Sequence, residues 1–584
     1  MIRRCSRSRV SSDIKTLLGI WKIQNPLNAS NLPRFFSSSP SRSIVVKRRD
    51  VTETIQFDPY VPKRNENKIY KDLKRANKRT KKDTVDQTSK DNIRHLEIQD
   101  ALKGHAKINL ETIENSPSLI DAFLFSKNRP CVTIPSVEII YQTSEGDGIG
   151  FIPKSLYAAP YVEEDEELYD RFTVVIVPKT VVGDKVKVEL VRHYKYYAEG
   201  VLRQVLPAKS RSGPRKDELI VCDHFHDCSG CQLQMLTYED QLKFKQSVIH
   251  KAYRFFHPEL LESVDISRFG VVNGSPLQYA YRTKITPHLV HPRNDVDIPN
   301  IGFKHVEVRK GMVDVESCKI ATKILNLGYK HKKEQVLNKG PGKDQAGRME
   351  SLFFRESLRV DKDTGNANRV CISNNKLVIT EKIGDFVFQF DANSFFQNNN
   401  VILPDVLDYI RHHMSFNPEK FKYLVDTYCG TGFFGISLSK DIHKDGKIFG
   451  IELSPSAVED ATHNAKLNGL EVPSKVQIVE GQADSMFSNS AFRNAGMTGD
   501  KSVVIMDPSR KGSTKLFMQQ LLEFQPKLIV YVSCNVFTQA RDLAYFHEIC
   551  KKNNVNYRVR EVMGFDFFPQ TRHVETVAIL ELID

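Results

Sequence analysis

Short apolar runs alternate with helical segments over the last third of the chain. The candidate strands are residues 423–427, 447–452, 475–479, 502–507, 527–532, 556–562 and 574–582. Between them lie segments with a helical spacing of apolar residues, such as residues 454–469. Repeated strand–helix units are typical of a doubly wound, mostly parallel sheet that binds ligands at the carboxyl ends of its strands. We therefore expect an α/β domain over residues 386–584.

A different pattern fills residues 132–212, where apolar and polar residues alternate in short strands such as VKVEL at 186–190. A period of two with turn residues between the runs favours a small antiparallel barrel. Cations and aromatic rings follow the last alternating run at Arg192, Tyr194, Lys195, Tyr196 and Tyr197. This mixture is used for stacking and phosphate contacts on single-stranded nucleic acid, and an ordinary barrel face explains it equally well.

The amino-terminal part lacks such periodicity. Residues 1–49 contain eleven Lys or Arg, ten Ser and one acidic residue, which predicts a mitochondrial import signal cleaved near Phe36. The simpler alternative is a disordered basic tail. Residues 50–131 are expected to form a basic, partly disordered arm, because the run at 63–82 is rich in Lys and Arg and has few apolar anchors. We expect a mitochondrial protein, with a cytosolic or nuclear pool as an additional location.

The net charge of the chain indicates the kind of partner that it binds. The net charge is +13 and the isoelectric point about 9.0, which favours an anionic partner, nucleic acid before membrane. No apolar run approaches the roughly 20 residues that cross a bilayer. We expect a monomer with no membrane contact. Ten cysteines in 584 residues are too sparse for a secreted disulfide framework and indicate a reducing compartment.

Three of these cysteines are clustered, at Cys222, Cys228 and Cys231, and Cys318 follows far downstream. Such close spacing is typical of metal ligands. Four thiolates suit a [4Fe-4S] cluster, whereas His224 or His226 could complete a zinc site. We assign residues 213–385 to a central β-rich domain around this cluster.

A glycine turn follows the first strand of the α/β domain. Gly430, Gly432 and Gly435 form a G-x-G-x-x-G pattern, and Glu452 ends the next strand. An acidic residue about 20 positions beyond the turn suits a ribose diol. The spacing fits NAD and S-adenosylmethionine alike.

Three further polar segments lie at expected strand ends, at residues 507–512, 533–535 and 568–575. They include Asp507, Arg510, Cys534 and Glu575. Each has a simple structural explanation alone, but together they provide a nucleophile, an acid or base, and a cation beside the cofactor turn. Cys534 precedes an expected helix, whose amino end would favour its thiolate.

Six segments occur in an order that resembles one known family, the RNA uracil carbon-5 methyltransferases. They are DANSFFQNN, VDTYCGTGFFGISL, GIELSPSAVEDATHNAKLNG, MDPSRKGS, VSCNVFTQARDL and FPQTRHVETVAIL, and they cover about residues 390–584. Within the family the chain is most similar to fungal enzymes that act on the T-loop uridine of tRNA. Ser509 and Val536 stand where the family usually has proline.

The resemblance implies a Rossmann-like methyltransferase domain, an OB-like RNA-binding barrel of the TRAM type, and a tRNA T-arm as partner. It implies that S-adenosylmethionine is held by Gln397, Tyr428, Glu452 and Asp507. Cys534 would be the nucleophile and Glu575 the base. Cys222, Cys228, Cys231 and Cys318 match the iron–sulfur ligands of the family's bacterial ribosomal-RNA branch.

Alternatives from other classes remain open on the sequence. Ribosomal RNA is the alternative substrate. An NAD-dependent dehydrogenase would share the glycine turn but has no use for Cys534 and Glu575. An amino-group methyltransferase needs an aromatic residue where this chain has Arg510. A non-catalytic RNA-binding protein would need only the barrel and the basic arm.

Overall fold

The computed structural model describes residues 42–48, 51–57, 86–106, 132–152, 173–194, 196–207, 213–292, 299–339, 347–360, 367–415, 419 and 421–583. The predicted cleavage point of the import signal, the basic run at 63–82 and Lys195 lie outside these ranges. No helix within them is long and apolar enough to cross a membrane.

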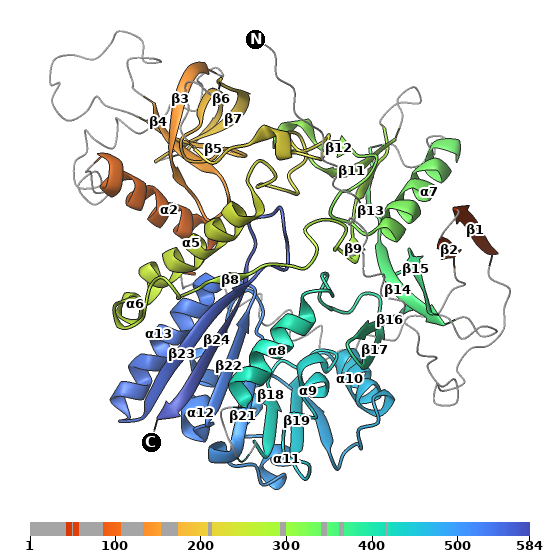
Figure 1. The fold of residues 1–584 in the computed structure, drawn as a ribbon, viewed down its shortest axis with the longest axis vertical. Coiled ribbons are helices and arrows are strands. Elements are labelled where there is room, and N and C mark those ends of the chain that lie inside the picture. The colour runs from red at the N-terminus through yellow and green to blue at the C-terminus, as the bar shows by residue number, and fades with distance from the viewer. Residues whose placement is uncertain are drawn as a thin grey trace, which may run out of the picture.

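An eight-stranded sheet forms the carboxyl-terminal half (Figure 1). Its strands in spatial order are β20 (Val476–Glu480), β19 (Lys447–Glu452), β18 (Tyr423–Asp426), β21 (Ser502–Met506), β22 (Leu528–Ser533), β24 (Glu575–Ile583), β23 (Asn556–Phe565) and β8 (Val272–Asn273). The strands from β20 to β22 are parallel, β24 is antiparallel to both neighbours, and β8 joins from far upstream. All seven strands expected from the apolar runs are present within three residues of their predicted ends.

Helices cover both faces of this sheet, because alternate side chains of each buried strand point to opposite sides. Ile529 and Tyr531 pack with α5, α12 and α13, whereas Leu528 and Val530 pack with α8 and α9. The helices are α5 (Tyr238–Phe256), α6 (Pro258–Ser263), α8 (Leu403–Met414), α9 (Phe433–Ser437), α10 (Pro455–Leu467), α11 (Ser490–Asn494), α12 (Lys515–Phe524) and α13 (Val536–Lys552). The expected doubly wound arrangement is therefore present.

A closed five-stranded barrel precedes the sheet. Its strands are β3 (Val132–Gln142), β4 (Gly148–Ile152), β5 (Thr173–Val177), β6 (Lys185–His193) and β7 (Ala198–Val205). The expectation of a purely antiparallel barrel is wrong at one seam, because β5 and β7 pair in parallel to close it. Gly200 is required inside, since a Cβ there would lie 2.4 Å from Val188 Cγ1.

Part of the predicted basic arm is an ordered helix, α2 (Lys90–Ala101), followed by a π-helical turn (Leu102–Ala106). Ser89 caps it by accepting a hydrogen bond from the Asn92 backbone N–H. Ile98, Ala101 and Leu102 are buried against the outside of the barrel. Burial of these apolar side chains explains why this segment folds although its surroundings are strongly polar.

Small sheets fill the central region. They are built from β9 (Lys284–Ile285), β10 (His288–Val290), β11 (Asn300–Lys304), β12 (Met312–Asp314), β13 (Met349–Ser351), β14 (Phe354–Val360), β15 (Ala367–Ile372), β16 (Val378–Ile383) and β17 (Phe386–Asp391). Helix α7 (Lys323–Lys339) packs on them, and a separate hairpin is formed by β1 (Arg42–Arg48) and β2 (Val51–Phe57). The β-rich character expected for residues 213–385 is observed, although α5, α6 and α7 also lie in that range.

Candidate active site

Several ionisable side chains lie at one edge of the large sheet. Asp426 and Glu452 end β18 and β19, Asp507 follows β21, and Cys534 follows β22. Glu575 begins β24, which runs in the opposite direction, so its amino end meets the carboxyl ends of the parallel strands. The topology thus places at a single edge residues that lie up to 149 positions apart.

Cys534 lies between β22 and α13, and it is half-buried. Burial raises the pKa of its thiol to about 12, the carboxyl groups of Glu575 and Asp507 act in the same direction, and Arg510 opposes them. The net pKa shift of Cys534 therefore disfavours the thiolate, although the amino end of α13 was expected to favour it. Desolvation and two neighbouring carboxyl groups outweigh the helix dipole, which is a weaker effect.

Glu575 is 7% exposed. Burial raises the pKa of its carboxyl group to about 7, against the influence of Arg510. The pKa of Asp507 is also well above its usual value, because it is desolvated and lies near Glu575 and Asp426. A carboxyl group with a pKa close to neutrality can both accept and return a proton at physiological pH.

The glycine turn is held by two carboxylates. Gly430 and Gly432 adopt φ values of 53° and 85°, where side chains are disfavoured. Glu452 accepts hydrogen bonds from the backbone N–H of Gly430 at 3.1 Å and of Ser454 at 2.8 Å. Asp426 Oδ2 accepts from the Gly435 N–H at 3.1 Å.

Asp426 precedes the glycine turn and is not among the site residues that the sequence predicts. Its Oδ1 is buried without a hydrogen-bond partner among the described residues. Desolvation and the nearby Glu452 raise the pKa of Asp426 to about 7. An unpaired acceptor beneath the turn is suited to a donor from a bound cofactor.

The segment after β21 is fixed by α13. Tyr428 Oη is 2.8 Å from Ser513 Oγ, and the Ser513 N–H donates to Asp542 at 2.7 Å. Asn535 donates to the Arg510 carbonyl at 2.9 Å, which links the segment of Cys534 to that of Asp507. The Asn535 side chain also caps α13 by accepting from the Phe537 N–H at 3.2 Å. This cap defines the helix start at Val536, where the family usually has proline.

Gln397 lies in a segment after β17 that is supported from below by a buried arginine. Arg355 is 1% exposed and donates to the carbonyls of Ala392 at 3.0 Å and Ser394 at 2.8 Å. Next to Gln397, Phe396 is buried, whereas Phe395 is 73% exposed. No pattern in the sequence indicates the role of Arg355, because that role depends on contacts between segments far apart in the chain.

The four predicted metal ligands share one region, and none of them forms a disulfide. Burial raises the pKa of Cys231 to about 12, with Cys318 and Cys228 adding to it, so these thiols lie near one another. Lys179 donates to the backbone carbonyls of Phe225, Cys228 and Cys231. Four thiolates are suitable ligands for an iron–sulfur cluster. However, no three His, Cys, Asp or Glu side chains in the described ranges are arranged to hold a metal ion.

The aromatic residues beyond β6 do not form an open stacking surface. The rings of Tyr194 and Tyr197 stack on each other at 4.5 Å, and Arg94 of α2 donates to Tyr197 Oη at 2.8 Å. Tyr196 lies 5.4 Å from the ring of His95 on the same helix. These contacts favour the interpretation as a barrel face, here covered by α2.

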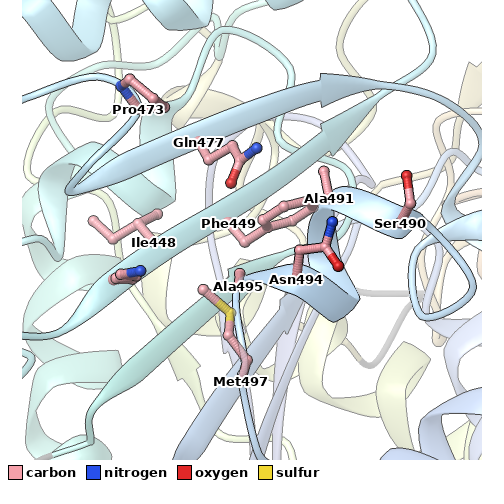
Figure 2. A pocket seen from close by; sticks show the side chains of 10 residues that line it. Ile448, Phe449, Pro473, Gln477, Ser490, Ala491, Asn494, Ala495 and Met497 are labelled. Carbon is pink, nitrogen blue, oxygen red and sulfur yellow. The ribbon is translucent and has the colours of Figure 1, made fainter.

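Two hollows lie away from the reactive edge. One, of about 350 Å³, is at the opposite end of β19, where Lys447, Phe449, Asn494 and Met497 line it (Figure 2). Another, of about 500 Å³, lies between β7 and the turn at 306–310. Neither includes Cys534 or Glu575, so neither is a candidate for the reaction site.

The sheet order, the glycine turn and the thiol–carboxyl edge define a protein of the Rossmann-like methyltransferase class. A solved structure supports this fold: Pyrococcus abyssi tRNA (uracil-54, C5)-methyltransferase in complex with S-adenosyl-L-homocysteine is similar with a TM-score of 0.51, at 23% identity, over 76% of this chain and 100% of that one. More specifically, the chain belongs to the tRNA (uracil-5-)-methyltransferase family, whose model matches residues 362–583.

Two fungal relatives extend the match beyond the catalytic domain. The tRNA (uracil(54)-C(5))-methyltransferase of Saccharomyces cerevisiae is 32% identical over 87% of this chain and 85% of its own length. Its counterpart in Schizosaccharomyces pombe is 36% identical over 76% of this chain and 77% of its own length. The predicted family is confirmed, and an NAD-dependent dehydrogenase and a non-catalytic RNA-binding protein are not supported.

Proposed function

We propose that this protein transfers a methyl group from S-adenosylmethionine to carbon 5 of the T-loop uridine of tRNA. The observation that carries the proposal is that Cys534 and Glu575 lie close together at the cofactor edge of the sheet, next to the register pair of Ser533 and Thr576. The names of the fungal relatives support tRNA as the substrate.

The methyl donor is expected at the glycine turn. Glu452 would accept hydrogen bonds from the ribose hydroxyls, since its carboxylate already accepts one from the Gly430 N–H in the turn. Tyr428 would lie beside the amino-acid portion, and Gln397 and Asp507 would complete the site. S-adenosylmethionine supplies an electrophilic methyl group, and all other chemistry falls to the protein and the uracil.

Carbon 5 of uracil is a weak nucleophile and must be activated. The Cys534 thiolate adds to carbon 6, which converts the ring into an enolate whose carbon 5 attacks the methyl group. The bond between the methyl group and sulfur breaks, and S-adenosylhomocysteine is the leaving group. Because the pKa of the Cys534 thiol is raised, the thiol must lose its proton to solvent as the sulfur attacks, which leaves the Glu575 carboxylate free for the later step. The target base must leave its stack to reach this buried edge.

The bond between Cys534 and carbon 6 must then break to release the methylated base. The Glu575 carboxylate removes the proton from carbon 5, the electron pair of that bond restores the double bond between carbons 5 and 6, and the Cys534 thiolate is expelled. Glu575 then returns the proton to solvent. Its pKa of about 7 suits both steps.

Other parts of the chain would serve RNA binding. The closed barrel is suited to an OB-like, TRAM-type role, and the net charge of +13 favours phosphate contacts. Because Tyr194 and Tyr197 stack on each other, the barrel would contribute phosphate contacts more than base stacking. Cys222, Cys228, Cys231 and Cys318 would hold an iron–sulfur cluster that stabilises this region and takes no part in methyl transfer.

The test uses substrates and cells. Purified protein with labelled S-adenosylmethionine should methylate tRNA transcripts carrying an intact T-arm, and not ribosomal RNA fragments or a tRNA with the T-loop uridine replaced by cytidine. Deletion should remove 5-methyluridine from tRNA. Mapping total and mitochondrial RNA separately would report where the enzyme acts, and loss confined to ribosomal RNA would contradict the proposal.

A further inference from the structure

The segment that leads to Glu575 is held mostly by parts of the chain outside the catalytic sheet. Residues 566–574 connect β23 to β24 and rise from the sheet toward α5 (Figure 1). Gln570 at its centre is 2% exposed and adopts a φ of 71°, which is unfavourable for a residue with a side chain. Such a conformation persists only where surrounding contacts impose it.

Several of these contacts come from residues 222–233, here called the cysteine segment. The backbone N–H groups of Gln232 and Leu233 both donate to the Gln570 carbonyl at 3.0 Å. The side chain of Gln232 accepts a hydrogen bond from the Arg572 N–H at 3.2 Å and donates to the Ser229 carbonyl at 2.8 Å. Gln232 directly follows Cys231, and it is hydrogen-bonded to Arg572, three positions before Glu575.

Helix α5 and the barrel complete the support. Gln241 exchanges two hydrogen bonds with Gln570, each of 3.0 Å. Lys245 forms a fully buried ion pair with Asp566. From the barrel, Glu145 pairs with Arg572 at 3.0 Å. The segment that leads to Glu575 is thus held by three parts of the chain that precede the catalytic domain in sequence: the cysteine segment, α5 and the barrel.

Cys534 is positioned differently. Its neighbour Asn535 is held by Ser533, Phe537 and the Arg510 carbonyl, all within the catalytic domain. The nucleophile and the base therefore have separate supports. A change in the cysteine segment should displace the base and leave the nucleophile in place.

We propose that Gln232 is a positioning residue through which the cysteine segment orients Glu575 for release of the covalent intermediate. The inference rests on the proposed function, because it takes Glu575 as the base that removes the carbon-5 proton. The side-chain amide of Gln232 accepts a hydrogen bond from the Arg572 backbone N–H and does not contact the reacting atoms. Loss of this contact slows proton removal, while thiolate addition and methyl transfer proceed.

The test measures protein-bound methyl label on a denaturing gel, with full-length protein, T-arm RNA and methyl-labelled S-adenosylmethionine. Gln232→Met keeps the size of the side chain and removes its hydrogen bonds. We expect turnover to fall about tenfold, since a misplaced base loses much of its usual contribution. Labelled adduct should accumulate as it does in Glu575→Gln, and the first methyl transfer should keep its wild-type rate.

Two matched variants sharpen the result. Gln232→Glu retains an acceptor for the Arg572 N–H and should return adduct toward the wild-type level. Gln246→Met makes the same change on α5, at an amide that donates to the Phe269 carbonyl and not to residues 566–574, and should not accumulate adduct. Adduct in Gln232→Met no higher than in Gln246→Met, or equal in Gln232→Glu and Gln232→Met, would overturn the inference.

The two proposals fail in different ways. If Glu575→Gln accumulates adduct and Gln232→Met does not, the function stands and the positioning role is wrong. If neither Glu575→Gln nor the wild type forms an adduct, the covalent mechanism itself is wrong. Simple destabilisation by Gln232→Met would lower methyl transfer and adduct together, and that result would also overturn the inference.

Discussion

Cys534 and Glu575 are the residues next to the register pair formed by Ser533 and Thr576 on the adjacent antiparallel strands β22 and β24. The strand pairing therefore brings a thiol and a carboxyl group together although 40 residues separate them. The carboxyl group of Glu575 raises the pKa of the Cys534 thiol. This pairing is the basis of the first predictions.

Replacing the two residues should have opposite effects on the covalent complex. Cys534→Ala should bind RNA and form no denaturant-stable adduct, because it lacks the attacking sulfur. Glu575→Gln retains size and polarity without the base, so adduct should accumulate and turnover should fall about 10²- to 10⁴-fold. A denaturing gel with labelled RNA measures both. Normal turnover by Glu575→Gln, or adduct formed by Cys534→Ala, would show that the roles are wrongly assigned.

The release step should depend on pH through Glu575. Only its carboxylate can take the carbon-5 proton, and its pKa is about 7. The rate should therefore rise with pH and reach half its maximum near pH 7. Single-turnover measurements from about pH 5.5 to 8.5 would follow it. A flat profile, with substrate binding unchanged, would argue against this base.

Glu575 should also reduce stability at neutral pH. Its folded-state pKa is raised above the ordinary value of 4.5, so the folded protein keeps a proton that the unfolded chain loses. The associated stability is complete below about pH 4.5 and is lost as pH rises through 7. Glu575→Gln cannot ionise and should be more stable than wild type at pH 8, by about 1–3 kcal/mol. Urea unfolding at pH 8 and pH 4.5 tests this difference, which should vanish at the lower pH.

Cofactor choice can be tested at Glu452. Glu452→Gln should weaken S-adenosylmethionine binding about tenfold, because it removes the charge that is proposed to face the ribose. Glu480 is the register partner of Glu452 at the end of β20 and is exposed, so Glu480→Gln is a matched control and should bind normally. Calorimetry with S-adenosylmethionine and with NAD gives the answer. Tight binding of NAD would contradict the assignment.

The cysteine cluster predicts a metal content. Anaerobically purified protein should be brown and contain iron and sulfide, and replacing Cys222, Cys228, Cys231 or Cys318 by serine should remove both. Cys550, a buried thiol in α13 outside this set, provides the control, and Cys550→Ala should keep the colour. Colourless wild-type protein with one zinc ion would refute the iron–sulfur assignment.

The apolar pattern predicted the main sheet well. Strands such as β21 and β22 are buried on both faces, and their continuous apolar runs leave little doubt about their type. The barrel was also predictable from alternation. The parallel β5–β7 seam was not, because pairing partners across a closed barrel depend on long-range geometry. Helix α2 was missed, since only contact with the barrel compensates its polar composition.

The order of short motifs along the sequence was enough to assign the family, and it predicted the glycine turn, Glu452, Cys534 and Glu575 as site residues. How these groups behave depends on the folded structure around them. Desolvation gives Glu575 a pKa near 7 and reverses the expected shift of Cys534, and both effects depend on what surrounds each side chain. The link from Gln232 to Arg572 joins residues 340 positions apart. A motif fixes residue types along the chain, whereas burial and long-range contacts arise only when the chain is packed.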